Sequence, residues 1–212
     1  MVTAGAVLIS FSAVFVKLAH VSPTMAGFYR TFFGGIMLLI ILVLRREALW
    51  KGVSFLFLGI FCGLAFSLDL FFWHKSIHYV GPGLATILAN FQVFLLALYG
   101  VLVLREPVSI RTMVAIPLAF FGLFLLAGIH WRQLGEAYRL GVVLGLATAA
   151  CYAVYILSLR KLQSQKNAPS AMANLAVISI VSALLLGSSA WVQNDPFGIP
   201  DLQSIFSLVA YG

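Results

Sequence analysis

The sequence predicts an all-α protein that crosses a membrane many times. Three observations predict this fold class. Hydrophobic residues make up 62% of the 212 residues and charged residues only 9%, the mean hydropathy is +1.07, and nearly uncharged runs of about 20 residues recur along the whole chain. An ordinary soluble domain carries roughly 25% charged residues. The composition therefore excludes a soluble globular protein.

The apolar runs predict seven spans and the beginning of an eighth. A bilayer core of about 30 Å needs about 20 helical residues. The runs of this size are 2–20, 25–44, 53–75, 82–104, 109–128, 140–159 and 170–192. An eighth run, 202–212, is too short to cross a bilayer, so we expect the chain to stop inside a helix. We expect the first run to be a retained span, because no small-x-small cleavage site precedes Ser22.

Proline-containing turns mark where three of the spans begin. Ser22-Pro23-Thr24, Gly81-Pro82-Gly83 and Ala168-Pro169-Ser170 precede the second, fourth and seventh spans. Proline suits the first turn of a helix, since its missing N–H would have no partner there. These turns predict tight hairpins between neighbouring spans.

Glycine pairs within two spans predict close helix contacts. Gly59 and Gly63 lie in the third span, and Gly141 and Gly145 lie in the sixth. Small residues four positions apart occupy one helix face and allow another helix to approach closely.

The basic residues predict the orientation. Eight follow the second, fourth and sixth spans, and four lie on the opposite side. The eight are Arg45, Arg46, Lys51, Arg105, Arg111, Arg160, Lys161 and Lys166, and the four are Lys17, Lys75, Arg132 and Arg139. Cytoplasmic loops are enriched in Lys and Arg, so we expect a cytoplasmic N-terminus. The basic residues stand singly or in pairs between apolar runs, which excludes nucleic-acid binding.

An internal repeat is visible in the sequence. Pro23-Thr24-Met25-Ala26 reappears as Pro169-Ser170-Ala171-Met172-Ala173, and Ser12–Lys17 has an echo in Tyr152–Ile156. Five spans precede the polar link 129–139, and an odd number of spans inserts the second copy upside down. This is the inverted-repeat plan of secondary transporters, whose substrate site lies near the midplane between the halves. We expect one unit at 1–128 and an incomplete second unit at 139–212.

Several of these segments resemble the EamA-type unit of the drug/metabolite transporter superfamily. The segments are Ser12–Lys17, Ser22-Pro23 followed by Tyr29-Arg30, the hairpin through Gly81, Ala85, Asn90 and Gln92, and Leu104-Arg105-Glu106. The first five spans resemble this unit throughout, whereas the second unit does so only for two helices and a stub. The family is built on a ten-helix plan.

The resemblance implies a function. It implies a multi-pass exporter in the bacterial cytoplasmic membrane that moves small metabolites, amino acids or drugs by alternating access. The implied partners are a small-molecule substrate, the lipid bilayer and a coupling ion or proton, and both a monomer and a homodimer remain open. A non-transporting membrane scaffold or interaction protein, or an inactive fragment of such a carrier, is the alternative.

Two ionised side chains lie well inside predicted spans, Arg30 and Asp69. A charge at mid-bilayer costs about 2.5 to 3.5 kcal/mol on insertion scales, so such residues are candidates for function. Arg30 lies about 7 Å below the outer end of its span, and Asp69 about 9 Å below the outer end of the next. We therefore expect a salt bridge between these antiparallel neighbours. The open alternatives are a structural lock, a substrate or proton-coupling role, and unpaired snorkelling.

Four further residues are candidates for a substrate cavity. Lys17 matches a lysine that the resemblance places here, at the lip of the cavity for anionic substrates, and snorkelling to the interface is the alternative. Asn90 continues the helix face of Thr86 and is expected to face the cavity or to hydrogen-bond to another helix. Tyr152 and Tyr155 belong to an aromatic stripe that either lines the cavity or serves packing.

An enzyme is the competing class. His74 and His78 have the i, i+4 spacing of two metal ligands on a helix. A catalytic metal needs at least three ligands, and the nearby Asp69 lies about 140° around the helix from His74. Gly-x-Ser-x-Gly, His-Glu-x-x-His and Gly-rich phosphate-loop motifs are absent from the sequence. We therefore expect no metal, no cofactor and no enzymatic activity.

Overall fold

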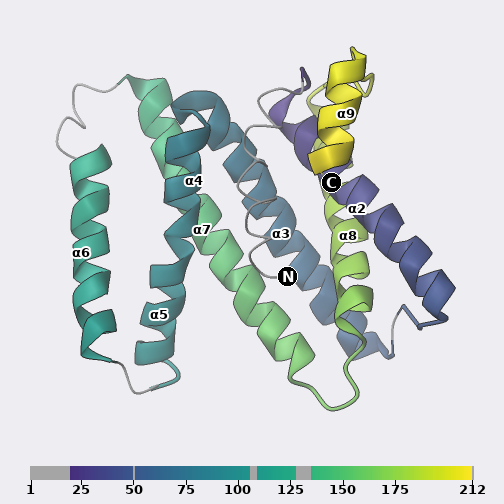
Figure 1. Ribbon diagram of the computed structural model, residues 1–212, viewed down its shortest axis with the longest axis horizontal. Helices are drawn as coiled ribbons and strands as arrows, with labels where there is room; N and C mark the ends of the chain where they lie inside the picture. Colours follow the sequence, from purple (N-terminus) through teal and green to yellow (C-terminus); the bar gives the residue numbers. More distant parts are fainter. Residues whose placement is uncertain (1–19, 50, 106–108, 128–134, 212) are drawn as a thin grey trace.

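Figure 1 shows the computed structural model, which describes residues 20–49, 51–105, 109–127 and 135–211. Within these ranges all regular structure is helical. The helices are α2 (Pro23–Arg45), α3 (Val53–Val80), α4 (Pro82–Asn90), α5 (Gln92–Leu102), α6 (Ile110–Ala127), α7 (Glu136–Gln163), α8 (Ala171–Val192) and α9 (Leu202–Tyr211). The first predicted span lies outside the described residues, apart from His20.

Five stretches of the described chain are long and apolar enough to cross a membrane. They are α2, α3, Pro82–Leu102, α7 and α8. The predicted fifth and eighth spans correspond to α6 and α9. The protein is therefore an all-α polytopic membrane protein, as its composition predicts.

α3 and α7 are longer than the apolar runs that predicted them. Each has 28 residues, because hydropathy marks only the part of a helix that lies in hydrocarbon. α3 continues to Val80, where Gly81-Pro82 ends it. α7 continues through Arg160 and Lys161, whose charges are favourable at a helix C-terminus.

The predicted span 82–104 is interrupted at Phe91, which separates α4 from α5. The Phe91 N–H donates to the Leu88 carbonyl (3.1 Å), and the Phe94 N–H donates to the Phe91 carbonyl (3.0 Å). These i→i−3 bonds belong to a tightened turn. Proline and glycine are absent within four residues of Phe91, so only the weak helix propensity of Asn90 gives a local signal.

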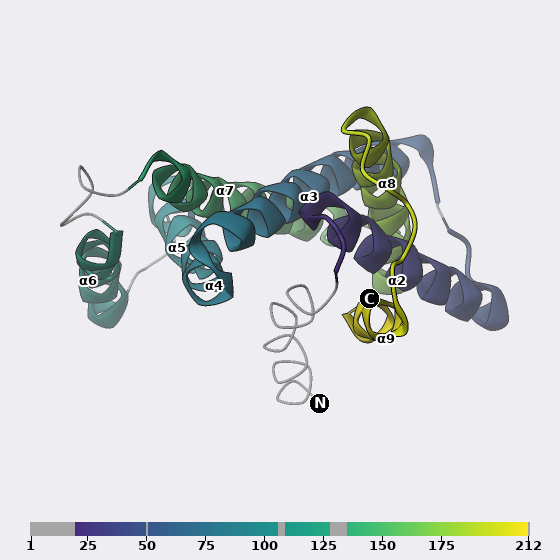
Figure 2. The same ribbon diagram turned by 90° about the horizontal axis from the view of Figure 1, so that it is seen from above.

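Helices α2, α3, α7 and α8 form the centre of the molecule. α3 packs against both α7 and α8, and α2 packs against α8. α4 and α5 lie beside α7, and α6 stands at the edge beyond them (Figure 2). This arrangement places Arg30, Asp69, Tyr152 and Tyr155 on central helices and Asn90 toward the edge.

Glycines set the distances between the central helices. A Cβ at Gly63 of α3 would lie 2.7 Å from Val181 Cβ of α8, and a Cβ at Gly145 of α7 would lie 2.8 Å from Leu88 Cβ of α4. Real Cβ contacts do not reach such distances, so only glycine fits. Gly59 and Gly141 also face neighbouring helices. The predicted role of both glycine pairs in close helix contacts is confirmed.

α2 and α8 begin in the same way. The Ser22 hydroxyl oxygen accepts a hydrogen bond from the N–H of the third residue after it (3.2 Å), and Ser170 does the same at the start of α8 (3.2 Å). Both serines are therefore N-caps, which satisfy an otherwise orphaned N–H.

α2 and α8, which the sequence repeat predicts to be equivalent, pack against each other in opposite directions. Gly27, near the start of α2, faces Leu186 near the end of α8. Leu42, near the end of α2, packs in one cluster with Ala173 near the start of α8. Antiparallel pairing of equivalent helices is the arrangement that an inverted repeat produces.

Exposed basic side chains gather at one side of the helices. We call this the lower side, where α2, α5 and α7 end, and we call the opposite side the upper side (Figure 1). The eight basic residues that the sequence assigns to one side of the membrane all lie here and are all exposed. Among the described residues, Lys75 and Arg139 lie toward the upper side. The uneven charge distribution is thus a feature of the fold.

Candidate functional site

A group of polar side chains lies between α2, α3 and α7. Asp69 of α3 is 6% exposed, and Arg30 of α2 is half-buried. The charge of Arg30 acts on Asp69 and His74 of α3 and on Tyr152 and Tyr155 of α7. We refer to these five residues as the central cluster.

The charge of Arg30 acts on Asp69, but no ion pair joins the two side chains in the part of the chain that the structure describes. The ion pair found among the described residues joins His20 and Asp201 instead. Asp69 lies close enough to α7 for its charge to act on Cys151. The expected direct salt bridge is therefore wrong, although the electrostatic coupling is present. Matching depths in two neighbouring helices do not bring side chains together, because rotation about each helix axis decides where they point.

His74 fills the contact between α2 and α3. It is 1% exposed, and its Nδ1 lies 2.6 Å from the Leu70 carbonyl oxygen. A carbonyl only accepts, so Nδ1–H is the donor. The imidazole lies beside Gly27, where a Cβ would be 3.4 Å from its Cε1 and Nδ1 atoms. Gly27 thus provides room for His74 one turn before Arg30.

The two tyrosines of α7 lie side by side at the contact with α3. Tyr155 is 5% exposed, and its ring centroid is 5.0 Å from that of Phe66. Tyr152 is half-buried, with its ring 5.4 Å from that of Tyr155. Tyr155 is therefore a packed residue, and Tyr152 is the more accessible of the two.

Asn90 and Lys17 do not join the central cluster in the described structure. Asn90 lines a groove of about 340 Å³ between α4, α5 and α6, which Arg30, Asp69 and Tyr152 do not line. Lys17 lies outside the described residues.

A second polar group ties distant parts of the chain together on the upper side. The His20 N–H donates to Ser204 Oγ (3.0 Å), and the His20 Nδ1–H donates to Asp201 Oδ2 (2.7 Å). The Ser22 hydroxyl donates to Asp195 Oδ2 (2.6 Å). We call these five residues the upper clasp. It holds the segment between α8 and α9 against the start of α2.

Asp201 has two separate partners in the upper clasp. While Oδ2 accepts from His20, Oδ1 accepts from the Ser204 N–H (2.6 Å) and caps α9. The hydrogen bond from His20 and those from Ser204 lower the pKa of Asp201 to about 2. Asp201 is therefore ionised at neutral pH.

The segment held by the clasp also covers the first turns of α2. The Tyr29 hydroxyl donates to the Phe197 carbonyl. The Phe197 ring packs edge-on against Phe28, with 5.8 Å between centroids. Arg30 follows these two residues directly, so the clasped segment lies over the same part of α2 as the central cluster.

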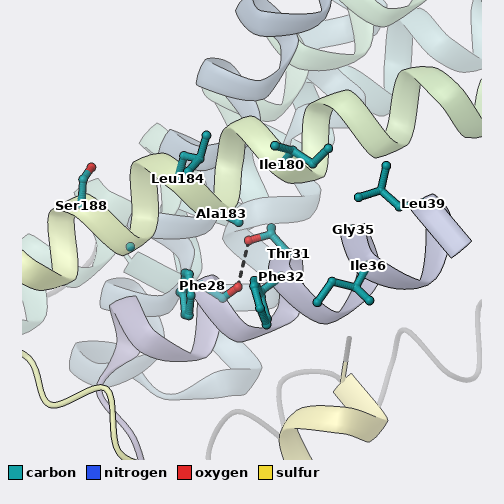
Figure 3. A pocket seen from close by; sticks show the side chains of 11 residues that line it. Phe28, Thr31, Phe32, Gly35, Ile36, Leu39, Ile180, Ala183, Leu184 and Ser188 are labelled. Atoms are coloured by element: carbon teal, nitrogen blue, oxygen red, sulfur yellow. Dashed lines mark hydrogen bonds between the residues drawn. The ribbon is translucent and has the colours of Figure 1, made fainter. Parts of the chain in front are cut away.

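Figure 3 shows a second groove, between α2 and α8, with a volume of about 370 Å³. Its walls include Phe28, Phe32, Ile36 and Leu184. The Thr31 hydroxyl in this groove already donates to the carbonyls of its own helix, at 3.0 and 3.1 Å. The groove therefore offers apolar surface to the bilayer.

The described residues contain no group of three His, Cys, Asp or Glu side chains able to hold a metal ion. His74 is buried, whereas His78 is exposed. The two histidines thus lie in different environments despite their i, i+4 spacing.

Sequence reasoning missed the upper clasp. Asp201 precedes an apolar run and so carries the signal of an N-cap. Its partner His20 is 181 positions away, and a single sequence gives no sign of such a pairing.

Comparison with known proteins supports the architecture. A solved structure described as "Crystal structure of protein" superposes with a TM-score of 0.71 and 18% sequence identity, covering 97% of this chain and 70% of that chain. At this identity the similarity shows the fold alone. No curated protein matches the chain. The EamA-like transporter family matches residues 1–128, more than half of the chain, and the chain therefore belongs to the EamA-like transporter family.

Proposed function

We propose that the protein is a secondary transporter that exports small metabolites, amino acids or drugs across the cell membrane by alternating access. Membership of a transporter family supports transport. The antiparallel pairing of the equivalent helices α2 and α8 supports alternating access between two inverted units, 1–128 and 139–212. A proton or another ion is the proposed coupling partner.

The observation that carries this proposal is the central cluster. Arg30 and Asp69 come from the proposed first unit, and Tyr152 and Tyr155 come from the second. Inverted-repeat carriers bind substrate between their units near mid-membrane. Polar and charged groups in a site of low dielectric attract a solute strongly, and the Asp69 carboxyl group makes no hydrogen bond or ion pair with the residues that the structure describes.

The chemistry of the cluster favours a solute that carries both an amino group and a carboxylate. Asp69 would bind the amino group, and Arg30 would bind the carboxylate. Tyr152 would contact the side chain of the solute, because it is more accessible than Tyr155. We propose Lys17 for the lip of the same cavity. Amino acids are therefore the first solutes to test.

Counterflow in proteoliposomes tests this function. The chain is reconstituted with a panel of labelled amino acids and neutral metabolites inside, and flux is measured for wild type, Arg30→Gln, Asp69→Asn and the double variant. Arg45→Gln is the matched control, since Arg45 is an exposed cation on α2. We expect Asp69→Asn to lower flux about tenfold to a hundredfold, the equivalent of one charge-assisted hydrogen bond.

The double variant separates function from structure. Recovered folded yield without recovered flux indicates charges that act on the solute. Recovered yield together with recovered flux indicates a structural lock and would remove the central cluster from the transport path. Absence of flux by the wild-type chain for every solute in the panel would contradict the proposed substrate classes.

A further inference from the structure

The groove between α4, α5 and α6 has one polar side chain, that of Asn90, among apolar walls. Its walls are formed by Ile87, Asn90, Phe91, Phe94, Ala119, Gly122 and Leu123, and its volume is about 340 Å³. Ile87 is 51% exposed, and α6 stands apart at the edge of the molecule (Figure 2). The groove is therefore open to the bilayer.

Asn90 gives this groove one available polar group. It makes no hydrogen bond with any residue that the structure describes, although its carboxamide has two N–H donors and an acceptor oxygen. By contrast, the hydroxyls of Thr31, Thr86 and Thr148 all donate to carbonyls of their own helices. Asn90 therefore presents unused hydrogen-bonding groups to the groove that it lines.

Asn90 lies deep within its membrane-spanning stretch, so its unused hydrogen-bonding groups are far from water. It lies eight residues, or about 12 Å, from the start of α4 at Pro82, which places it near the middle of the 21-residue stretch Pro82–Leu102. Lipid chains offer no hydrogen bonds at this depth. A carboxamide there is stabilised only by a partner that brings its own polar group.

α6 leaves room for such a partner. Near the groove, the edge-on contact between Phe91 and Phe120, with centroids 4.8 Å apart, joins α6 to the rest of the protein. A Cβ at Gly122 would meet no atom within 4 Å. The α6 wall of the groove is therefore open at the level of Gly122.

We propose that this groove binds an uncharged amphiphile dissolved in the membrane. The molecule is largely hydrocarbon and carries one carbonyl or hydroxyl group, which hydrogen-bonds to Asn90. The bound molecule should be uncharged, because the walls of the groove contain no ionisable side chain that could pair with a charge. The site is separate from the central cluster, so it does not depend on the proposed transport of amino acids.

Photolabelling in lipid nanodiscs tests the site with two matched probes, a long-chain alcohol and the corresponding alkane, each carrying a diazirine. Labelled peptides are mapped by mass spectrometry. We expect the alcohol to label α4 and α6 about three- to tenfold more than the alkane, the ratio that one membrane hydrogen bond provides. Equal labelling by the two probes would overturn the proposal.

Variants identify the groups responsible. Asn90→Leu should remove the preference for the alcohol, and Asn90→Gln should retain most of it. Thr31→Val, in the groove between α2 and α8, is the control and should change nothing. Gly122→Leu should fill the groove and reduce labelling by both probes. If Asn90→Leu fails to fold, the Gly122→Leu variant provides the test. Undiminished labelling of α4 and α6 in Gly122→Leu would refute the site.

Discussion

Asp201 shows how one carboxylate joins two parts of the chain. One oxygen caps α9 through the Ser204 N–H, and the other accepts from His20. The pKa of Asp201 is lowered to about 2 by these bonds, first of all by that from His20. Its folded-state stabilisation is therefore complete above its ordinary pKa of 3.8 and is lost as the pH falls through about 2.

Asp201→Asn isolates the contact with His20, because asparagine is also a good N-cap and keeps α9 capped. We expect this variant to lower the thermal unfolding midpoint in detergent at pH 7. The difference from wild type should shrink as the pH falls from 4 toward 2, since wild-type Asp201 then becomes protonated. His20→Ala should be destabilising at pH 7, and the double variant should be no worse than the more severe single variant. Additive losses would mean that the two side chains do not interact.

The residues of the central cluster illustrate what one sequence reveals at this scale. Arg30 and Asp69 stand out because charges within apolar runs are costly and therefore rare. Their lack of direct contact was unpredictable, because it depends on helix rotation. The sequence singles out His74 only for its metal-ligand spacing with His78, whereas its burial against Gly27 depends on the packing of α2 on α3.

At the scale of helices, hydropathy predicted the spans well and their ends less well. α2 and α8 begin where their serine caps indicate. α3 and α7 extend beyond their apolar runs, and the interruption at Phe91 has no proline or glycine to mark it. Local sequence therefore fixes helix starts through caps, whereas the other boundaries also depend on packing.

Gly63 sets the contact between α3 and α8. In Gly63→Ala the new Cβ would lie 2.7 Å from Val181 Cβ and Cγ1, and overpacking of this kind costs about 1 to 3 kcal/mol. We expect a lower free energy of unfolding in detergent despite the better helix propensity of alanine. Gly83→Ala is the control, since its Cβ meets nothing within 4 Å. Adding Val181→Ala to Gly63→Ala should restore stability, and no restoration would place the strain elsewhere.

For the whole molecule, the repeat and the charge distribution were both visible in the sequence. The repeated turn at Pro23 and Pro169 predicts two inverted units, which remains a prediction. The antiparallel packing of α2 and α8 is compatible with it. The sequence did not reveal which of its candidate residues lie together in the structure and which lie apart. Asn90 lines the groove beside α6, whereas His20 belongs to the upper clasp.

The charge distribution leads to an orientation that labelling can check. If the basic lower side is cytoplasmic, as Lys and Arg enrichment predicts, Gln165 lies inside the cell and Gly198 outside. Gln165→Cys and Gly198→Cys are placed singly in a variant lacking Cys62 and Cys151. A membrane-impermeant thiol reagent applied to intact cells should label the second and spare the first. Labelling of position 165 alone would reverse the assignment.

The pairing of α2 with α8 also has a consequence for biosynthesis. About 126 residues separate the end of α2 at Arg45 from the start of α8 at Ala171. At 5 to 20 residues per second, α2 is complete about 6 to 25 s before its partner begins to be made. Asp69 follows Arg30 by about 2 to 8 s on the same scale. The glycine-bearing face of α2 must therefore tolerate lipid, or a temporary neighbour, until translation supplies the helix that covers it.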